Sequence, residues 1–129
     1  MSDSIQALVI DDDRASAVIL ETLLLSEGMS ATTIDHPAQL ANIVTQLPDL
    51  RIIFVDLELP TQDGYEVLGW LRANLAPDIL IAAYSVHTSE SISAMKKGFN
   101  AFIGKPINRK DFAVNLRRIL NREQVMAIS

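Results

Sequence analysis

The chain has 129 residues, of which 49% are hydrophobic and 21% are charged, which is typical of one globular domain and excludes a disordered chain. Cysteine is absent, so disulfides and thiolate metal sites are excluded, and the apolar runs are too short to cross a bilayer. The net charge of −5 argues against nucleic acid as a direct partner, because phosphate binding requires a basic face.

Short apolar runs alternate with amphipathic helical patterns along the chain, without a repeat or a linker. The predicted strands cover residues 6–10, 31–34, 52–55, 79–84 and 101–103. The predicted helices cover residues 15–27, a segment that opens at Pro37, a segment after Gly64, and residues 89–97 and 111–122. This alternation predicts one α/β domain, with a five-stranded parallel sheet and helices on both faces. We place its core within residues 5–122, followed by a short tail, 123–129, whose apolar stretch suits either a linker or a packing segment.

Acidic residues end two of the apolar runs. Asp11–Asp13 follow the first run, and Asp56 follows the third. In the doubly wound strand order 2-1-3-4-5, the first and third strands are neighbours, so both acidic ends meet where such sheets bind ligands. The same order places Ser85 and Lys105 beside the acids, because they follow the fourth and fifth strands.

Crowded carboxylates favour a cation. Two carboxylates about 4 Å apart repel by roughly 1 kcal/mol in water and by roughly 4 kcal/mol at an effective dielectric near 20. Mg²⁺ binds one or two carboxylates, keeps several waters and adds phosphate oxygens. The acids therefore indicate a metal-assisted phosphoryl site rather than a general acid/base pair. A simpler alternative is that Asp11–Asp13 only cap the following helix.

Three motifs occur in a fixed order: Asp11-Asp12, then Asp56-Leu-Glu-Leu-Pro60 with Asp63-Gly64, then Lys105-Pro106. On these motifs the chain resembles, over nearly its full length, the receiver domain of two-component response regulators. The resemblance implies a flavodoxin-like fold and a cytoplasmic phosphoprotein of phosphorelay signal transduction. Such a domain accepts a phosphoryl group in a Mg²⁺-dependent reaction and relays the signal by a conformational change.

The resemblance also implies roles for single residues. Asp56 is the expected phosphoacceptor, and Asp12 and Asp56 are the expected direct Mg²⁺ ligands. Asp11 would hold metal-bound water, and the backbone carbonyl of Glu58 would complete the protein ligands. Lys105 would pair with the phosphoryl oxygens, and in this family the bond between that lysine and the following proline is usually cis.

Two further residues are candidates for the switch. Ser85 ends the fourth apolar run and would hydrogen-bond the phosphoryl group, although the family's usual spacing falls on Ala83, which has no hydroxyl. Phe102 matches the aromatic switch position, and a plain core aromatic is the alternative. For Tyr84 we expect only packing or partial exposure.

The expected partners are proteins. The resemblance implies a histidine kinase or phosphotransfer protein as the donor, and a downstream protein that reads the surface of residues 89–97, 101–103 and 111–122. It leaves open a phosphorylation-dependent dimer. We expect no direct contact with nucleic acid or membrane, and no enzymatic activity beyond self-phosphorylation and autodephosphorylation. No output domain follows residue 122, so either protein contacts relay the signal or the chain is part of a longer regulator.

Two other functions remain alternatives. A Mg²⁺-dependent phosphohydrolase with an aspartyl-phosphate intermediate usually carries a second acid two residues after the nucleophile, and Glu58 has that offset from Asp56. The segment lacks the Gly-Thr that usually follows in such enzymes. The other alternative, a degenerate receiver that only binds a partner, is disfavoured because Asp11, Asp12, Asp56 and Lys105 are all present.

Overall fold

A parallel six-stranded sheet forms the centre of the computed structural model, which describes residues 5–60 and 62–128. The strand order is β2-β1-β3-β4-β5-β6. The strands are β1 (Gln6–Ile10), β2 (Ser30–Ile34), β3 (Leu50–Asp56), β4 (Leu80–Ser85), β5 (Ala101–Gly104) and β6 (Val125–Ala127). The doubly wound topology and the predicted neighbours β1 and β3 are therefore confirmed.

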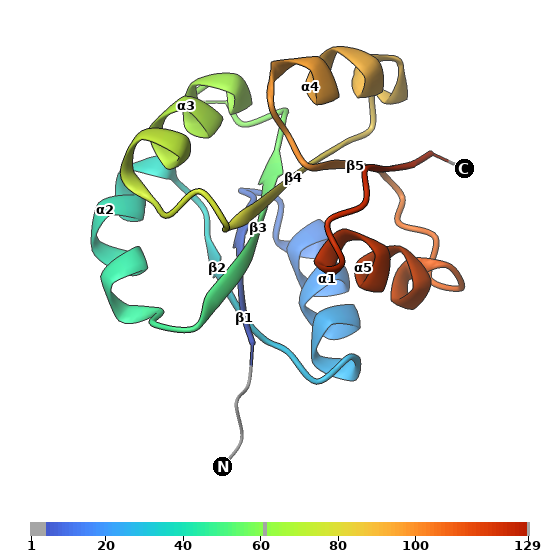
Figure 1. Ribbon diagram of the computed structural model, residues 1–129, viewed down its shortest axis with the longest axis horizontal. Coiled ribbons are helices and arrows are strands. Elements are labelled where there is room, and N and C mark those ends of the chain that lie inside the picture. The colour runs from blue at the N-terminus through green and yellow to red at the C-terminus, as the bar shows by residue number, and fades with distance from the viewer. Residues whose placement is uncertain (1–4, 61, 129) are drawn as a thin grey trace.

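Helices cover both faces of the sheet. They are α1 (Arg14–Ser26), α2 (Leu40–Ile43), α3 (Gly64–Asn74), α4 (Ser91–Lys97) and α5 (Phe112–Leu120). Figure 1 shows α2, α3 and α4 on one face and α1 and α5 on the other. The central strands β3 and β4 are buried along most of their length, as expected for a sheet covered on both sides.

Two hydrophobic clusters hold these layers together. On the face of α1 and α5, Leu20, Phe54 and Leu116 are buried in one cluster. On the face of α2, α3 and α4, Ile53, Leu71 and Phe102 are buried in the other. Side chains alternate between the two faces along each strand, so neighbouring residues of β4 and β5 belong to different clusters. This alternation decides which side chains of β4 reach the site.

The helix predicted from Pro37 is interrupted. The structure has a 3₁₀ turn at Pro37–Gln39, a single turn of α2, and a second 3₁₀ turn at Val44–Gln46. The β-branched residues of segment 43–45 have low helix propensity, and Pro48 disfavours helical backbone in the residue before it. A third 3₁₀ turn, Thr88–Glu90, precedes α4.

The sheet has one strand more than the predicted five. Part of the expected tail forms β6, which pairs in parallel with β5, and Val125 is buried in the cluster under α1 and α5. Gly104 permits this close approach, because a Cβ there would lie 2.9 Å from Thr88 Cγ2 and 3.4 Å from the carbonyl oxygen of Ala127. The packing-segment alternative therefore describes the structure of residues 125–127.

Candidate functional site

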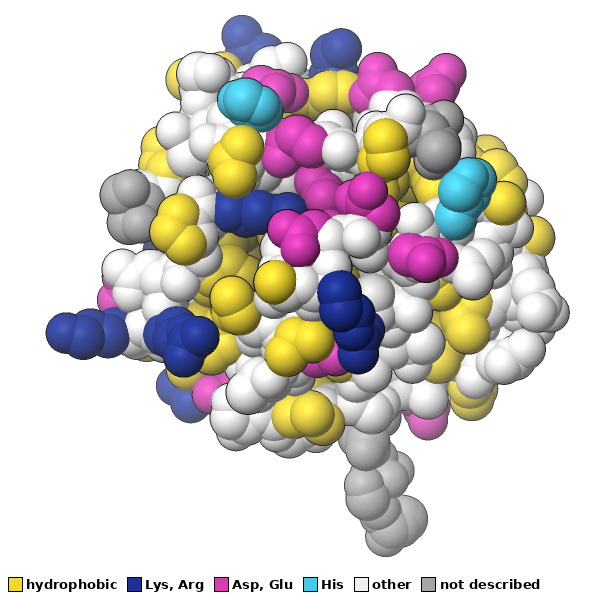
Figure 2. Space-filling model, turned by 180° about the vertical axis from the view of Figure 1, so that it is seen from behind, with side chains coloured by type: hydrophobic (Ala, Val, Ile, Leu, Met, Phe, Trp, Pro, Cys, Tyr) yellow, Lys and Arg dark blue, Asp and Glu magenta, His cyan; other side chains and the backbone are white. Residues whose placement is uncertain are grey.

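Three carboxylates meet at the carboxyl ends of β1 and β3. Asp11 and Asp12 directly follow β1, and Asp56 is the last residue of β3. One carboxylate oxygen of each lies within 4.8 Å of the others. Asp11 and Asp56 are each 2% exposed, whereas Asp12 is exposed, so the cluster opens to solvent on one side. On one face of the molecule, Figure 2 shows a group of acidic side chains bordered by basic and hydrophobic ones.

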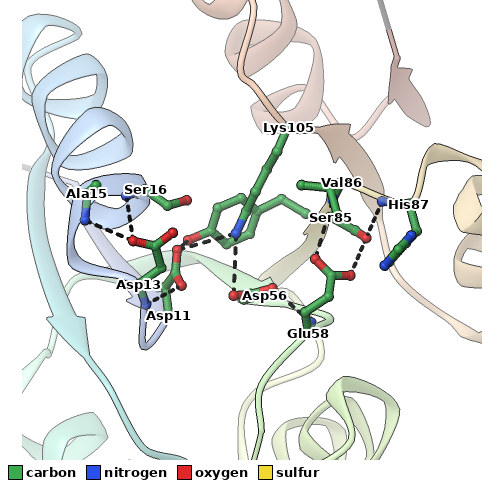
Figure 3. Close-up of polar contacts among 11 residues, drawn as sticks. Asp11, Asp13, Ala15, Ser16, Asp56, Glu58, Ser85, Val86, His87 and Lys105 are labelled. Atoms are coloured by element: carbon green, nitrogen blue, oxygen red, sulfur yellow. Dashed lines mark hydrogen bonds and ion pairs between the residues drawn. The ribbon is translucent and has the colours of Figure 1, made fainter.

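Lys105 lies between the two buried acids. Its Nζ is 3.3 Å from Asp56 Oδ2 and 3.5 Å from Asp11 Oδ2. Figure 3 draws both ion pairs as dashed lines. Lys105 directly follows β5, and its backbone N–H donates to the Ser85 carbonyl over 2.8 Å. The Lys105–Pro106 peptide bond is cis, which matches the expectation from the resemblance. The ends of β1, β3 and β5 thus supply two acids and one ammonium to a single site.

Backbone amides fix the orientation of the buried acids. The N–H of Glu58 donates to Asp56 Oδ1 over 2.8 Å, and the N–H of Asp13 donates to Asp11 Oδ1 over 2.9 Å. The remaining oxygen of each acid faces Lys105. Gly64 permits the turn after β3 to pack tightly, because a Cβ there would lie 2.7 Å from Leu57 Cδ2.

The helix-cap alternative describes Asp13 only. The Asp13 carboxylate is the N-cap of α1 and accepts hydrogen bonds from the amides of Ala15 and Ser16. Asp11 and Asp12 make no such cap. They belong to the group of acids instead.

The two buried acids differ in protonation. Burial and, to a smaller extent, the hydrogen bond with Asp11 together raise the pKa of Asp56 to about 7, although the Glu58 amide and Lys105 act in the opposite direction. Burial also opposes ionisation of Asp11, but hydrogen bonds with Asp56, Tyr84 and the Asp13 amide lower the pKa of Asp11 below its usual value. Without a cation, the pair therefore holds one proton at mildly acidic pH.

The donor set fits a hard divalent cation. Two buried carboxylates and one exposed carboxylate, all oxygen donors, can converge on one ion, and oxygen ligands are the ones Mg²⁺ prefers. A cavity of about 280 Å³ borders Asp11 and Asp12 on the side of β2, where Thr33 and Ile34 also line it. Among the described residues, this is the one group of three acidic or histidine side chains with such spacing.

Ser85 ends β4, and its hydroxyl is already hydrogen-bonded. The Oγ donates to the Glu58 carboxylate and accepts from the N–H of His87 over 2.9 Å. The other Glu58 oxygen accepts from the Val86 amide over 3.3 Å. The alternative residue, Ala83, lies inside the strand opposite Phe102 and offers no hydroxyl. Ser85 is thus the hydroxyl at the end of β4, and its switch role stays a prediction.

Phe102 and Tyr84 lie on opposite faces of the sheet. Phe102 is fully buried under α3 and α4, so its ring is a core aromatic in this conformation, and its switch role also stays a prediction. Tyr84 is fully buried on the other face, and its hydroxyl donates to Asp11 Oδ2. The expectation of plain packing for Tyr84 therefore missed a direct contact with the site. The signal available in the sequence was a hydroxyl-bearing side chain next to the strand end.

Comparison with known proteins identifies the family. The family model described as response regulator receiver domain matches residues 7–117. The chain belongs to this family. It is therefore a receiver domain of two-component signal transduction, as the motifs predicted.

Relatives and solved structures agree with this assignment. The DNA-binding response regulator MtrA of Mycolicibacterium smegmatis is 30% identical over 118 residues, which are 91% of this chain and 51% of that protein. MtrA of Mycobacterium leprae is 31% identical over 116 residues, which are 89% and 51%. The receiver domain thus spans about half the length of these relatives.

Solved structures share the fold. A response regulator receiver domain from Clostridium thermocellum superposes with a TM-score of 0.79 at 22% identity, covering 92% of this chain and 95% of the other. A sensor protein from Polaromonas sp. JS666 gives a TM-score of 0.79 at 25% identity, covering 91% and 96%. In the described part of the receiver domain, no helix has the length and hydrophobicity needed to span a membrane.

Proposed function

We propose that Asp56 accepts a phosphoryl group from a histidine kinase or phosphotransfer protein, and that this domain relays the signal to another protein. The observation that carries the proposal is the position of Lys105 Nζ, within 3.5 Å of both Asp11 and Asp56. An ammonium beside a buried acid can neutralise the negative oxygens of an incoming phosphoryl group. The acids alone would repel such a group.

The chemistry assigned to the residues is nucleophilic. Asp56 Oδ2, the oxygen that faces Lys105, attacks phosphorus, and the bond from phosphorus to the donor's leaving group breaks. The amide of Glu58 holds Asp56 Oδ1 and so fixes the direction of Oδ2. Lys105 neutralises charge on the phosphoryl oxygens during transfer.

The residues that would hold Mg²⁺ are Asp11, Asp12 and Asp56, whose carboxylate oxygens lie together. The backbone carbonyl of Glu58 is the further ligand that the family resemblance implies. When bound, Mg²⁺ supplies Lewis acidity and neutralises charge between the acids and the phosphoryl group. Asp56 must be ionised to attack, and its raised pKa supports a requirement for added positive charge at neutral pH. Asp12 is the exposed acid of the three and would be accessible to the ion from solvent.

Ser85 and Phe102 are the proposed relay. A phosphoryl group on Asp56 would attract the Ser85 hydroxyl, move the turn that follows β4 and change the space around Phe102. The affected surface is formed by α4, β5 and α5, where we propose that a downstream protein binds.

The MtrA relatives are DNA-binding response regulators. The net charge of −5 supports protein rather than DNA as the direct partner of this domain.

The phosphohydrolase alternative loses its main support. Glu58 would need a free carboxyl group to act as general acid, but both of its carboxylate oxygens accept hydrogen bonds from the end of β4.

The test of the proposed function is incubation with a small phosphodonor and Mg²⁺, followed by intact-mass measurement. We expect a stoichiometric gain of one phosphoryl group. Continuous release of phosphate from a generic phosphate ester would contradict the proposal and favour the hydrolase.

A further inference from the structure

Tyr84 makes two contacts with the site from the core of the sheet. It is the penultimate residue of β4, and its backbone pairs in register with Asp56. Its side chain is 0% exposed, although it is one of the largest in the core. The hydroxyl donates to Asp11 Oδ2, and Lys105 Nζ lies over the ring, 4.3 Å from its centroid.

These contacts converge on one carboxylate oxygen. Asp11 Oδ2 accepts from the Tyr84 hydroxyl and is also 3.5 Å from Lys105 Nζ. The other oxygen of Asp11 is held by the Asp13 amide. The direction of the Asp11 carboxylate therefore depends on Tyr84 at one end and on the backbone at the other.

The position of Lys105 depends on the same tyrosine. A lysine side chain has many rotamers, and its ammonium is attracted to the face of an aromatic ring. Here the ammonium has the Tyr84 ring on one side and the carboxylates of Asp11 and Asp56 within 3.5 Å. The ring thus limits the movement of the group that must meet the phosphoryl oxygens.

We propose that Tyr84 is a positioning residue for phosphoryl transfer, whose hydroxyl holds Asp11 and whose ring supports Lys105. The proposal rests on the proposed function. While the Tyr84 hydroxyl donates to Asp11, the Lys105 ammonium is shared between Asp11 and Asp56. Without that hydroxyl, Asp11 Oδ2 loses one of its two donors, and we expect it to draw Lys105 away from Asp56.

A packing role makes a different prediction. The Tyr84 ring belongs to the cluster under α1 and α5, and phenylalanine would fill that space almost equally well. Tyr84→Phe keeps the ring and its attraction for Lys105 but removes the hydroxyl. This variant therefore separates positioning from packing.

The chain offers a matched control. Tyr65 of α3 makes the same two kinds of contact. Its hydroxyl donates to the Glu90 carboxylate over 3.3 Å, and Lys97 Nζ lies 4.5 Å from its ring centroid. It has no contact with the acids of the site in this structure. Tyr65→Phe therefore makes the same chemical change away from the site.

The experiment compares wild type, Tyr84→Phe and Tyr65→Phe at saturating Mg²⁺. The rate of phosphorylation by a small phosphodonor is followed by intact mass, and the ε-methylene NMR resonances of Lys105 are recorded without phosphodonor. We expect Tyr84→Phe to react about tenfold more slowly, the effect of losing one hydrogen bond to a charged group, and to shift the Lys105 resonances. Tyr65→Phe should match wild type in both.

The outcomes are distinct. An unchanged rate in Tyr84→Phe would overturn the positioning role and leave the proposed function intact. A slower rate with unmoved Lys105 resonances would also overturn it, because the effect would not pass through Lys105. If the wild type takes no phosphoryl group, both the proposed function and the positioning role fail.

Discussion

The Ser85 hydroxyl donates a hydrogen bond to the carboxylate of Glu58, two residues after Asp56. Figure 3 shows this pair beside the site, with Glu58 also bound by the Val86 amide. The hydroxyl proposed to contact the phosphoryl group is therefore occupied in this conformation. Glu58 and the phosphoryl group compete for it, so the relay requires that one charge-assisted hydrogen bond be exchanged for another.

We expect Ser85→Ala to accept a phosphoryl group at Asp56 but to lose most of the response in α4 and β5. A hydrogen bond to a charged group is worth roughly 1.5–3 kcal/mol, enough to shift a two-state balance about tenfold or more. The measurement is the change in backbone NMR shifts on adding beryllofluoride, a phosphoryl mimic. A full wild-type response in Ser85→Ala would show that another group couples the site to this surface.

Glu58→Ala should ease the same transition. Removing the carboxylate frees the Ser85 hydroxyl and takes one negative charge from the site, so beryllofluoride should bind about fivefold or more tightly. Calorimetric titration at fixed Mg²⁺ gives the affinity. The control is Glu66→Ala, which removes an exposed acid of α3. Equal affinities in wild type and Glu58→Ala would mean that Glu58 does not restrain Ser85.

Mg²⁺ should raise the melting temperature by mass action, because the unfolded chain has no assembled site. Asp12→Ala should remove most of this shift, since Asp12 is the exposed member of the group of acids. Asp49→Ala, an exposed acid directly before β3, should keep it. If Asp12→Ala shows the full shift in differential scanning fluorimetry, then Asp12 is not a ligand.

The contribution of Asp56 to the stability of the Mg²⁺-free protein should fall as pH rises from about 4 to about 7. The pKa of Asp56 is raised from 3.8 to about 7, so over this window the folded state keeps a proton that the unfolded chain releases. The lowered pKa of Asp11 makes its contribution to stability rise with pH. That rise lies below the ordinary value of 3.8, and so outside the pH range in which Asp56 titrates.

Asp56→Asn removes the titrating group and one of the crowded charges. We expect it to be more stable than wild type at pH 7 by about 1–3 kcal/mol, and by less at pH 5, because wild-type Asp56 is mostly protonated there. Urea unfolding at both pH values measures the difference. A stability gap that does not change with pH would contradict the raised pKa.

The sequence predicted those parts of the site that follow from topology. Asp11, Asp12, Asp56 and Lys105 each lie at or just after the end of a strand, and parallel strands bring such ends to one edge. The contact of Tyr84 with the site was not predicted, because a tyrosine within an apolar run is expected to pack in the hydrophobic core. Its hydroxyl partner, Asp11, lies 73 residues away in the sequence.

Two features of the fold also depend on contacts that a local pattern does not contain. Strand β6 has three residues, too few for a periodic signal, and it forms because β5 offers a free edge and Gly104 leaves room beside it. The Glu58–Ser85 hydrogen bond joins the turn after β3 to the last residue of β4, and the fold sets the orientation of each side chain. Periodicity predicts strands and helices, but side-chain partners of this kind require the assembled structure.

The carboxylate of Asp56 is the proposed site of phosphorylation. Wild type and Asp56→Asn are incubated with a small phosphodonor and Mg²⁺, and intact masses are measured over time, with an Asp49→Asn variant as the control. We predict a gain of one phosphoryl group in wild type and in the control, and no gain in Asp56→Asn. A gain of one phosphoryl group in Asp56→Asn equal to that of wild type would show that another residue accepts the group.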